Sequence, residues 1–543
     1  MAASRPNILW ISLEDVSPRF GCTGDPVART PNIDRLAAEG VRFPNAFCVA
    51  PVCAPSRHAI IVGLYPTYSG AHHMRTTHRN PHTPELPTPY EVVLPPEAKI
   101  LPEYLRAAGY YCTNNVKTDY QFSPPVTGWD ENSREAHWRN RPDPSQPFFA
   151  VFNETFTHES GMWPREDRPL ETDPTTVSVP PYLPDTPRVR ETIARHYDNL
   201  ARADRFVGEL LEQLEEDGLA ENTIVFLWSD HGEGLPRAKR WLYDTGIRIP
   251  LIVRWPEAHR NGALAPGSTD DRLVSLIDLP PTVLSLCGLD IPAHMQGQPF
   301  LGPQAQPRQY VYATRDRYDE TYDMVRAVRD RRFKYIRNYR PELPRFLWIP
   351  YRNRHPAMQE LWRLHAEGRL EGPALELFRY PRPVEELYDC ENDPWELNNL
   401  ANNPAYREVL ERMRSALEAW RQRFDRWGEV PEAQMVSLFW NGSSQQPTTA
   451  PVVFVPIAPE QPGTDAAPEG GRYTDPTLLQ LHCATQGASI AWTTDPGESP
   501  RWRLYTEPIR LPVGTTTVRA KAIRIGYRES EERRATFTVQ PAG

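Results

Sequence analysis

Two uninterrupted apolar runs, each ending in ionisable side chains, restrict the possible folds of this chain more than any other feature. They span residues 7–13 and 223–228. Continuous apolar runs of this length are typical of strands buried on both faces of a parallel sheet. Ligands of such sheets bind at the carboxyl ends of the strands. The residues that we expect to meet there are Glu14, Asp15, Asp230 and His231.

The spacing of helices and strands predicts the fold class. Further apolar runs occupy 148–152 and 249–253, and residues 189–219 carry apolar side chains at the helical period. Strands that alternate with helices favour an α/β fold with a mostly parallel central sheet flanked by helices. The chain has 543 residues, which is too many for one core, so we expect several domains.

We predict four segments from the change of pattern along the chain. An α/β catalytic domain covers 1–308, and a smaller α+β subdomain with an antiparallel sheet and a helix covers 309–441. Residues 442–471 are rich in Ser, Gln, Pro and Gly, which indicates a linker. Short runs separated by turns predict a β-sandwich at 472–543.

Charge and cysteine content limit the functional classes. The net charge of −9 disfavours nucleic-acid binding, which needs a basic face. The seven cysteines include no C-x-x-C pair, so neither a disulfide framework nor a zinc knuckle is expected. No leader or membrane-spanning pattern is visible, and we therefore expect a cytoplasmic protein without membrane contact.

The densest motif surrounds Cys53. The sequence Cys53-Ala-Pro55-Ser-Arg57 has the Cys-x-Pro-x-Arg pattern and resembles the signature of the sulfatase family, within the alkaline phosphatase superfamily. Ordered matches to the same family follow at 30–43, 230–232, 246–253 and 386–400. The Glu14–Asp15 opening and the 72–75 run look like the heparan N-sulfatase branch.

This resemblance implies that a formylglycine-generating enzyme converts Cys53 to formylglycine. A hydrated aldehyde carries two hydroxyls on one carbon, so one can attack sulfur and form a covalent sulfate ester. The other then loses its proton, rebuilds the aldehyde and expels sulfate. A serine in the same place would leave an ester that water must break.

The resemblance also implies a site for one divalent cation. Its ligands are the strand-end residues Glu14, Asp15, Asp230 and His231, with an oxygen of the converted Cys53. Oxygen-rich ligation makes Ca²⁺ the first choice, and the imidazole allows Mn²⁺, with Mg²⁺ a further alternative. Many sulfatases have paired aspartates and an asparagine where this chain has Glu14 and His231.

Catalytic roles follow from matching positions. Arg57 is expected to steady the hydrate, Lys117 and Lys239 to bind sulfate oxygens, and His158 to act as general acid at the leaving oxygen. Many sulfatases have Lys-x-His where this chain has Lys117-Thr-Asp119. Either Asp119 or one of the histidines at 72 and 73 takes over the collapse of the hydrate.

The remaining predictions concern the substrate and partners. His73, Arg75 and Arg315 are expected to contact the part of the substrate that carries no sulfate. Residues around 487–522 resemble the chitobiase C-terminal β-sandwich, whose expected role is packing, glycan binding or contact in a homodimer.

We therefore predict a sulfuric ester hydrolase acting on an aryl or sugar sulfate, a small anionic ester. Two alternatives remain open. The same machinery serves a phosphonate monoester or phosphodiester hydrolase, possible as a promiscuous activity because these tetrahedral anions are of similar size. With an unmodified Cys53, the chain is instead a non-catalytic metal- and glycan-binding protein.

Overall fold

The computed structural model describes residues 5–165, 167–260 and 264–542. Residues 1–4, where a leader pattern would begin, therefore lie outside the described residues. The chain divides into two compact units. The first comprises residues 1–75, 79–86 and 150–430, and the second comprises residues 76–78, 87–149 and 431–543.

A parallel strand pair organises the first unit. Strand β1 (Asn7–Leu13) pairs with β7 (Thr223–Ser229) in register, with Leu13 opposite Ser229. Both strands are buried along their whole length, as continuous apolar runs require. Strands β8 (Leu251–Arg254) and β2 (Val41–Arg42) continue the sheet antiparallel, and β6 (Phe148–Glu154) lies beside β1.

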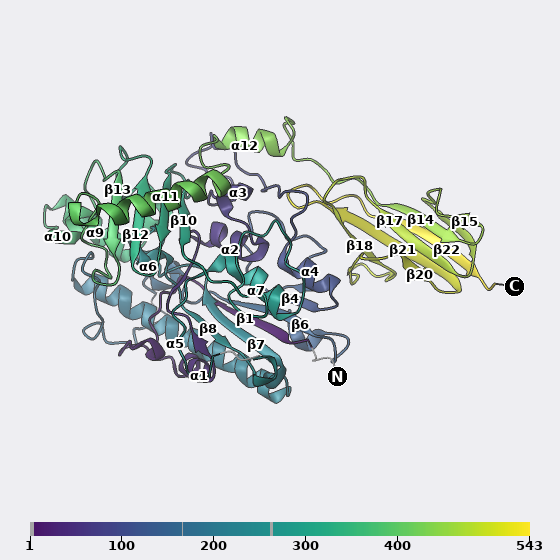
Figure 1. Ribbon diagram of the computed structural model, residues 1–543, viewed down its shortest axis with the longest axis horizontal. Helices are drawn as coiled ribbons and strands as arrows, with labels where there is room; N and C mark the ends of the chain where they lie inside the picture. The colour runs from purple at the N-terminus through teal and green to yellow at the C-terminus, as the bar shows by residue number, and fades with distance from the viewer. Residues whose placement is uncertain (1–4, 166, 261–263, 543) are drawn as a thin grey trace. The chain divides into compact units, whose positions relative to one another are not determined.

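Two helices of the first unit matter most for the site. Helix α5 (Pro187–Glu216) begins where Thr186 accepts a hydrogen bond from the Val189 amide, and it packs against α1 (Pro31–Glu39) (Figure 1). Helix α2 (Cys53–Val62) is buried at every residue and ends at Gly63, whose φ of 75° suits glycine. Cys53 is thus the first residue of a buried helix.

A four-stranded antiparallel sheet completes the first unit and confirms the predicted fold class. It consists of β10 (Val311–Arg315), β11 (Val325–Arg329), β12 (Phe333–Asn338) and β13 (Glu385–Asp389). Helix α11 (Arg407–Phe424) covers it with the apolar side chains Leu410, Met413, Leu417 and Trp420 (Figure 1).

The connection between β12 and β13 carries three short helices, α8 (Pro350–Asn353), α9 (Pro356–Ala366) and α10 (Gly372–Glu376). Shorter elements of the first unit are β3 (Ala46–Phe47), α3 (Pro66–Ser69), α6 (Asp244–Ile247), β9 (Val274–Ser275) and α7 (Leu279–Leu286). Single 3-10 turns of this unit lie at Gly21–Thr23, Glu159–Met162, Ala220–Asn222, Glu257–His259, Leu276–Asp278 and Pro404–Tyr406.

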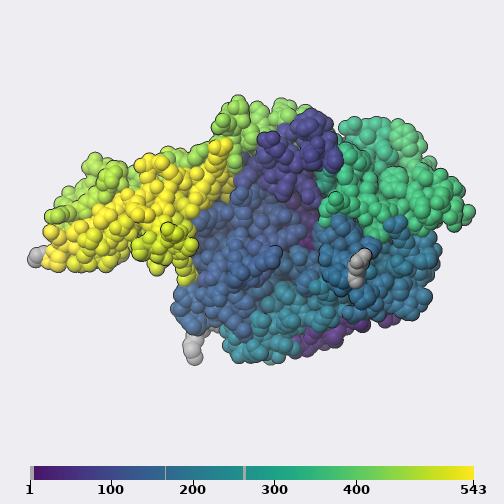
Figure 2. All heavy atoms as spheres, turned by 180° about the vertical axis from the view of Figure 1, so that it is seen from behind, coloured from purple at the N-terminus to yellow at the C-terminus, as the bar shows by residue number. Residues whose placement is uncertain are grey.

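The second unit contains a two-sheet sandwich, whose atoms are coloured yellow-green to yellow in Figure 2. One sheet has the order β15-β14-β17-β20 and the other β16-β22-β21-β18-β19. The first comprises β14 (Val453–Ala458), β15 (Gln461–Pro462), β17 (Thr477–His482) and β20 (Ile509–Leu511). The second comprises β16 (Gly470–Thr474), β18 (Ser489–Thr493), β19 (Arg503–Leu504), β21 (Gly514–Ile523) and β22 (Arg533–Gln540).

Residues 87–149 pack on this sandwich within the second unit. They form α4 (Leu101–Ala107), the parallel pair β4 (Tyr111–Asn115) and β5 (Glu131–Asn132), and a 3-10 turn at Trp138–Asn140, while α12 (Glu432–Phe439) precedes the sandwich. Lys99 Nζ donates to the Gly487 carbonyl over 2.6 Å, and the Arg524 guanidinium donates to the Leu94 carbonyl.

The prediction of a linker at 442–471 is wrong, because this range contains strands. Strands β14 and β15 lie inside this range, and β14 pairs antiparallel with β17. Phe454 points into the sandwich core, and alternate residues of β14 are buried. The many prolines and polar residues around the strand hid this period of two. The other domain boundaries stay predictions. Within the described residues, no helix has both the length and the apolarity needed to cross a bilayer.

Candidate functional site

The parallel pairing of β1 and β7 brings the predicted strand-end residues together. The Asp15 amide donates to Asp230 Oδ1 over 3.2 Å, and His231 Nε2 lies 3.1 Å from Asp15 Oδ1. The sulfur of Cys53, at the start of α2, lies 3.4 Å from His231 Nε2. Four side chains from three distant segments thus meet at one buried point.

This cluster has the donor set of a cation site. One ligand atom each of Asp15, Cys53, Asp230 and His231 can be chosen so that all lie within 4.8 Å of one another. His231 Nδ1 contacts the Gly232 carbonyl at 2.9 Å, which only accepts, so in the neutral ring Nε2 presents its lone pair to the cluster. Burial and the charge of Glu14 raise the pKa of Asp230. These donors therefore fit a divalent cation, which would offset their charge.

Arg57 ties the acidic residues together from one helical turn beyond Cys53. Its side chain is 3% exposed. It lies 2.8 Å from Glu14 Oε2 and 3.1 Å from Asp230 Oδ2, and it also donates to Asn153 Oδ1 over 2.8 Å. Because the planar guanidinium holds several acceptors at once, it fixes the two carboxylates in one geometry.

Lys239 brings a second buried cation to the cluster. Its ammonium lies 2.8 Å from Asp15 Oδ2 and 3.2 Å from Glu159 Oε1. Burial alone would lower the pKa of Lys239, but the neighbouring Asp15 outweighs it and the pKa is raised well above the usual range. Burial alone would raise the pKa of Asp15, yet Lys239 and His231 hold it well below the usual range. Lys239 therefore remains charged.

His158 is oriented by the turn that it caps. The Ser160 amide donates to His158 Nδ1 over 3.3 Å, so the neutral imidazole carries its proton on Nε2. Burial and then the charge of Lys239 lower the pKa of His158. Ligand atoms of His158, Glu14, Asp15 and Cys53 lie within 4.8 Å of one another. The neutral imidazole can donate a hydrogen bond from Nε2, whereas a general acid requires the protonated ring, which the charges of Asp15 and Glu14 favour.

The 72–75 run contacts the segment around Arg317 next to Cys53. The Arg317 amide donates to His73 Nδ1 over 3.3 Å, and Met74 and Tyr318 pack in one apolar cluster with Cys53. Arg75 Nε lies 2.5 Å from Asp319 Oδ1. Met74 of this run therefore packs beside Cys53, and the predicted substrate contacts of His73 and Arg75 stay predictions.

Three predicted residues are not brought into this cluster by their contacts. Arg315 is buried, with its Nε 3.4 Å from Asp323 Oδ2 and its guanidinium over the Trp241 ring. Lys117 and Asp119 belong to the second unit, where Lys117 Nζ lies 3.2 Å from Asp119 Oδ2. The roles assigned to these residues stay predictions.

The structure adds charged residues that the sequence reading missed. Glu159 accepts two hydrogen bonds from Arg240, over 2.8 and 2.9 Å, and it also contacts Lys239. Both missed residues directly follow predicted ones in the chain, His158 and Lys239. Their position next to predicted site residues was the feature of the sequence that could have identified them, because single charged residues in loops follow no periodic hydrophobic pattern.

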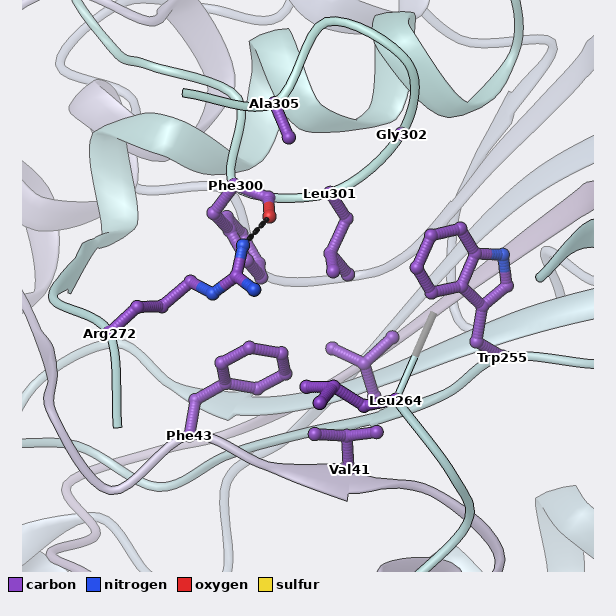
Figure 3. Close-up of a pocket in the computed structure, with 10 residues that line it drawn as sticks. Val41, Phe43, Trp255, Leu264, Arg272, Phe300, Leu301, Gly302 and Ala305 are labelled. Atoms are coloured by element: carbon purple, nitrogen blue, oxygen red, sulfur yellow. Dashed lines mark hydrogen bonds between the residues drawn. The ribbon is translucent and has the colours of Figure 1, made fainter. Parts of the chain in front are cut away.

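A separate hollow in the first unit has a different character. Its volume is about 290 Å³, and its walls are mostly apolar, with Phe43, Trp255 and Leu301 among them (Figure 3). Among the described residues that line it, the one charged side chain is Arg272, which donates to the Phe300 carbonyl and pairs with Asp270. The described lining of this pocket includes neither a nucleophile nor a metal ligand, so the strand-end cluster is the better candidate for catalysis.

Comparison with known proteins identifies three family models that match this chain. The family model described as Sulfatase matches residues 6–135 and 136–289. The model for the C-terminal part of N-sulphoglucosamine sulphohydrolase matches 232–347. The chitobiase/beta-hexosaminidase C-terminal domain model matches 468–533.

Individual relatives give the same picture. The chain is 43% identical to an ulvan-active sulfatase of Formosa agariphila, over 97% of this chain and 90% of the relative. It is 28% identical to N-sulphoglucosamine sulphohydrolase of Homo sapiens, over 80% and 93%. A solved structure described as a complex with its substrate D-glucosamine-2-N,6-O-disulfate covers 79% of this chain and 99% of its own, with a TM-score of 0.54 and 18% identity.

Proposed function

The chain belongs to the sulfatase family, and from this premise we propose that it hydrolyses a sugar sulfate with a formylglycine made from Cys53. It is an enzyme of the sulfatase class. The observation that carries the proposal is the 3.4 Å separation between the Cys53 sulfur and His231 Nε2, inside a set of carboxylates. The sulfur stands where conversion would put an oxygen.

Each buried group around Cys53 has a chemical part in this proposal. A divalent cation, with Ca²⁺ the first choice, would polarise a sulfate oxygen as a Lewis acid. Its protein ligands would be Glu14, Asp15, Asp230 and His231.

Arg57, Lys239 and His158 have the remaining roles in this proposal, which are to position the metal ligands, to stabilise charge and to donate a proton. Arg57 holds Glu14 and Asp230 in place through hydrogen bonds to both carboxylates. Lys239 supplies a fixed positive charge for sulfate oxygens as the ester bond breaks. His158, in its protonated form, gives its Nε2 proton to the departing sugar oxygen, which is a poor leaving group without it, and is left as a neutral ring.

The choice of a sugar is supported by the relatives. The 43% identical protein is named for activity on ulvan, and the 28% identical human protein for a sulfated glucosamine. The chitobiase-like C-terminal domain is of a type described from carbohydrate enzymes. We therefore propose a sulfated saccharide as the substrate class.

Mass spectrometry and sulfate release together test this proposal. The enzyme is co-expressed with a formylglycine-generating enzyme, and the Cys53 peptide is expected to be lighter by about 18 Da, because a thiol is replaced by an aldehyde. Sulfate released from a panel of sulfated saccharides is then measured by ion chromatography, with and without Ca²⁺ or Mn²⁺. Conversion without sulfate release from any member would contradict the proposal.

Two controls separate the alternatives. Cys53→Ala removes the nucleophile and is expected to abolish turnover while leaving the fold intact, because the residue gains no volume. Rates on an aryl sulfate, a phosphonate monoester and a phosphodiester measure the competing activity of the same site. A kcat/KM that favours the phosphorus esters by orders of magnitude would replace the sulfatase reaction with that activity.

A further inference from the structure

Two aromatic side chains lie directly beyond His158. The ring of Tyr351 lies 6.1 Å from the His158 ring and 5.3 Å from the Trp163 ring, measured between centroids. The guanidinium of Arg75 lies over the same Tyr351 ring, 5.2 Å from its centroid. Because His158 is part of the cluster around Cys53, Tyr351 lies next to this cluster, beside the residue that is proposed to act at the leaving group.

Tyr351 comes from a segment outside the matched family models. It lies in α8, within the connection 339–384 between β12 and β13. The N-sulphoglucosamine sulphohydrolase C-terminal model ends at residue 347, and the chitobiase-type match begins only at 468. The contact to His158 is therefore supplied by a segment that lies outside these family models.

Arg75 is positioned to accept a ligand as well as to pair with an acid. Its side chain is 42% exposed although its Nε is 2.5 Å from Asp319 Oδ1. One edge of the guanidinium is held by this carboxylate, which fixes its orientation, and its face rests on Tyr351. Planar, oriented guanidinium groups recognise carboxylate and sulfate oxygens in a bidentate manner.

Several arginines lie near the aromatic pair, together with the acids Glu159 and Asp319. Arg352, next to Tyr351, is 3% exposed, and its Nε and Nη1 have no hydrogen-bond acceptor among the described residues. Burial, followed by the charges of Arg240 and Arg315, lowers the pKa of Arg352 to about 9. An anionic group bound nearby would relieve this field, whereas a neutral group would not.

We infer that Tyr351 and Trp163 form a stacking platform for the sugar ring next to the sulfated position, and that Arg75 binds an anionic substituent on that ring. This inference rests on the proposed sugar sulfatase function and specifies its substrate class. The sugar ring presents an apolar face to the partly exposed aromatic pair, alongside the guanidinium groups of Arg75 and Arg354, which lie over the Tyr351 and Trp163 rings. Its substituent, a carboxylate or a second sulfate, meets Arg75.

Kinetics on matched substrates test the inference. The substrates are an aryl sulfate, a sulfated disaccharide with a uronate neighbour, and the same disaccharide with its carboxyl group reduced to an alcohol. Tyr351→Ala is expected to raise KM for the uronate disaccharide about tenfold, and to lower its kcat/KM relative to the aryl sulfate by the same factor. Tyr351→Phe keeps the ring and is expected to restore both values to within about twofold.

Arg75→Met tests the anionic contact because it keeps an apolar side chain of similar length without the charge. The wild-type enzyme is expected to prefer the uronate disaccharide over the reduced one by about tenfold, and Arg75→Met to remove this preference. Tyr380→Ala, a change at a 65% exposed aromatic of the same segment, is the control and is expected to behave as wild type.

The outcomes separate this inference from the proposed function. No sulfate release from any substrate by the wild-type enzyme, including the aryl sulfate, would remove the sulfatase proposal and the inference together. Normal aryl sulfatase activity with an unchanged disaccharide KM in Tyr351→Ala would overturn the platform alone. An equal preference for both disaccharides in wild type and Arg75→Met would overturn the anionic contact. A fall in kcat for all substrates with KM unchanged would mean that Tyr351 only positions His158.

Discussion

Replacing Arg57 by alanine should leave the buried carboxylates of Glu14 and Asp230 without their arginine partner and so destabilise the protein. Glu14 and Asp230 are fully buried, and Arg57 lies 2.8 and 3.1 Å from their oxygens. Removing one partner of a buried ion pair costs roughly 3–5 kcal/mol, because the remaining charge stays desolvated. At roughly 2 °C per kcal/mol for a large domain, the Tm in EDTA should fall by roughly 6–10 °C.

A bound cation should reverse much of this loss. Arg57→Ala makes the cluster more negative, so added Ca²⁺ or Mn²⁺ should raise its Tm more than that of the wild type. The matched control is Arg326→Ala, since Arg326 is equally buried between Asp316 and Asp425. Differential scanning calorimetry of the three proteins, in EDTA and in excess metal, gives the comparison. Equal metal-induced shifts in all three would refute the assignment of a cation site beside Arg57.

Three further predictions follow from individual residues. His158→Gln should lower kcat/KM for a sugar sulfate by about 100-fold or more and affect an aryl sulfate with a good leaving group much less, measured by steady-state kinetics. Burial lowers the pKa of His196 to about 4; its contribution to stability, up to about 3 kcal/mol, is complete above pH 6.5 and is lost as pH falls through 4. The Tm, measured by thermal unfolding at a series of pH values, should therefore drop between pH 6.5 and 4, and it should drop less steeply in His196→Gln. A mutant curve that matches the wild-type curve would contradict this prediction. Gly487→Ala should destabilise the second unit by roughly 1–3 kcal/mol more than Gly442→Ala, as urea unfolding would detect. Both glycines have a φ of +77°, but only at 487 would a Cβ lie 2.5 Å from a backbone oxygen, that of Pro96, whereas nothing lies within 4 Å at 442.

The strand ends could be predicted because their signals are local and strong. The apolar runs before Asp15 and Asp230 fix two buried strands, and the rule for parallel sheets then places both acids at one edge. The register of β1 with β7 agrees with this expectation. Cys53 could also be predicted as a member of the site because its motif is specific. Its distance to His231 could not be predicted, because it depends on the packing of α2.

Other parts of the site could not be predicted, for physical reasons. Glu159 and Arg240 act as a buried pair, and a pair formed by two loops leaves no periodic trace in either. Tyr351 lies in a helix of only four residues, too short to produce an amphipathic period. Strand β14 was masked by its own proline at 456, since proline is unfavourable within most strands.

The charges of the buried cluster connect its geometry to the substrate. Its acids are Glu14, Asp15, Asp230 and Glu159, and its permanent cations are Arg57, Lys239 and Arg240. Four negative and three positive charges leave one negative charge, and a divalent cation converts this to one positive charge. A sulfate ester carries a single negative charge and brings the closed site to neutrality. Because unbalanced buried charge is costly, this arrangement favours singly charged esters over phosphate monoester dianions. Phosphonate monoesters and phosphodiesters carry the same single charge, so the same balance gives a physical reason to expect them as secondary substrates.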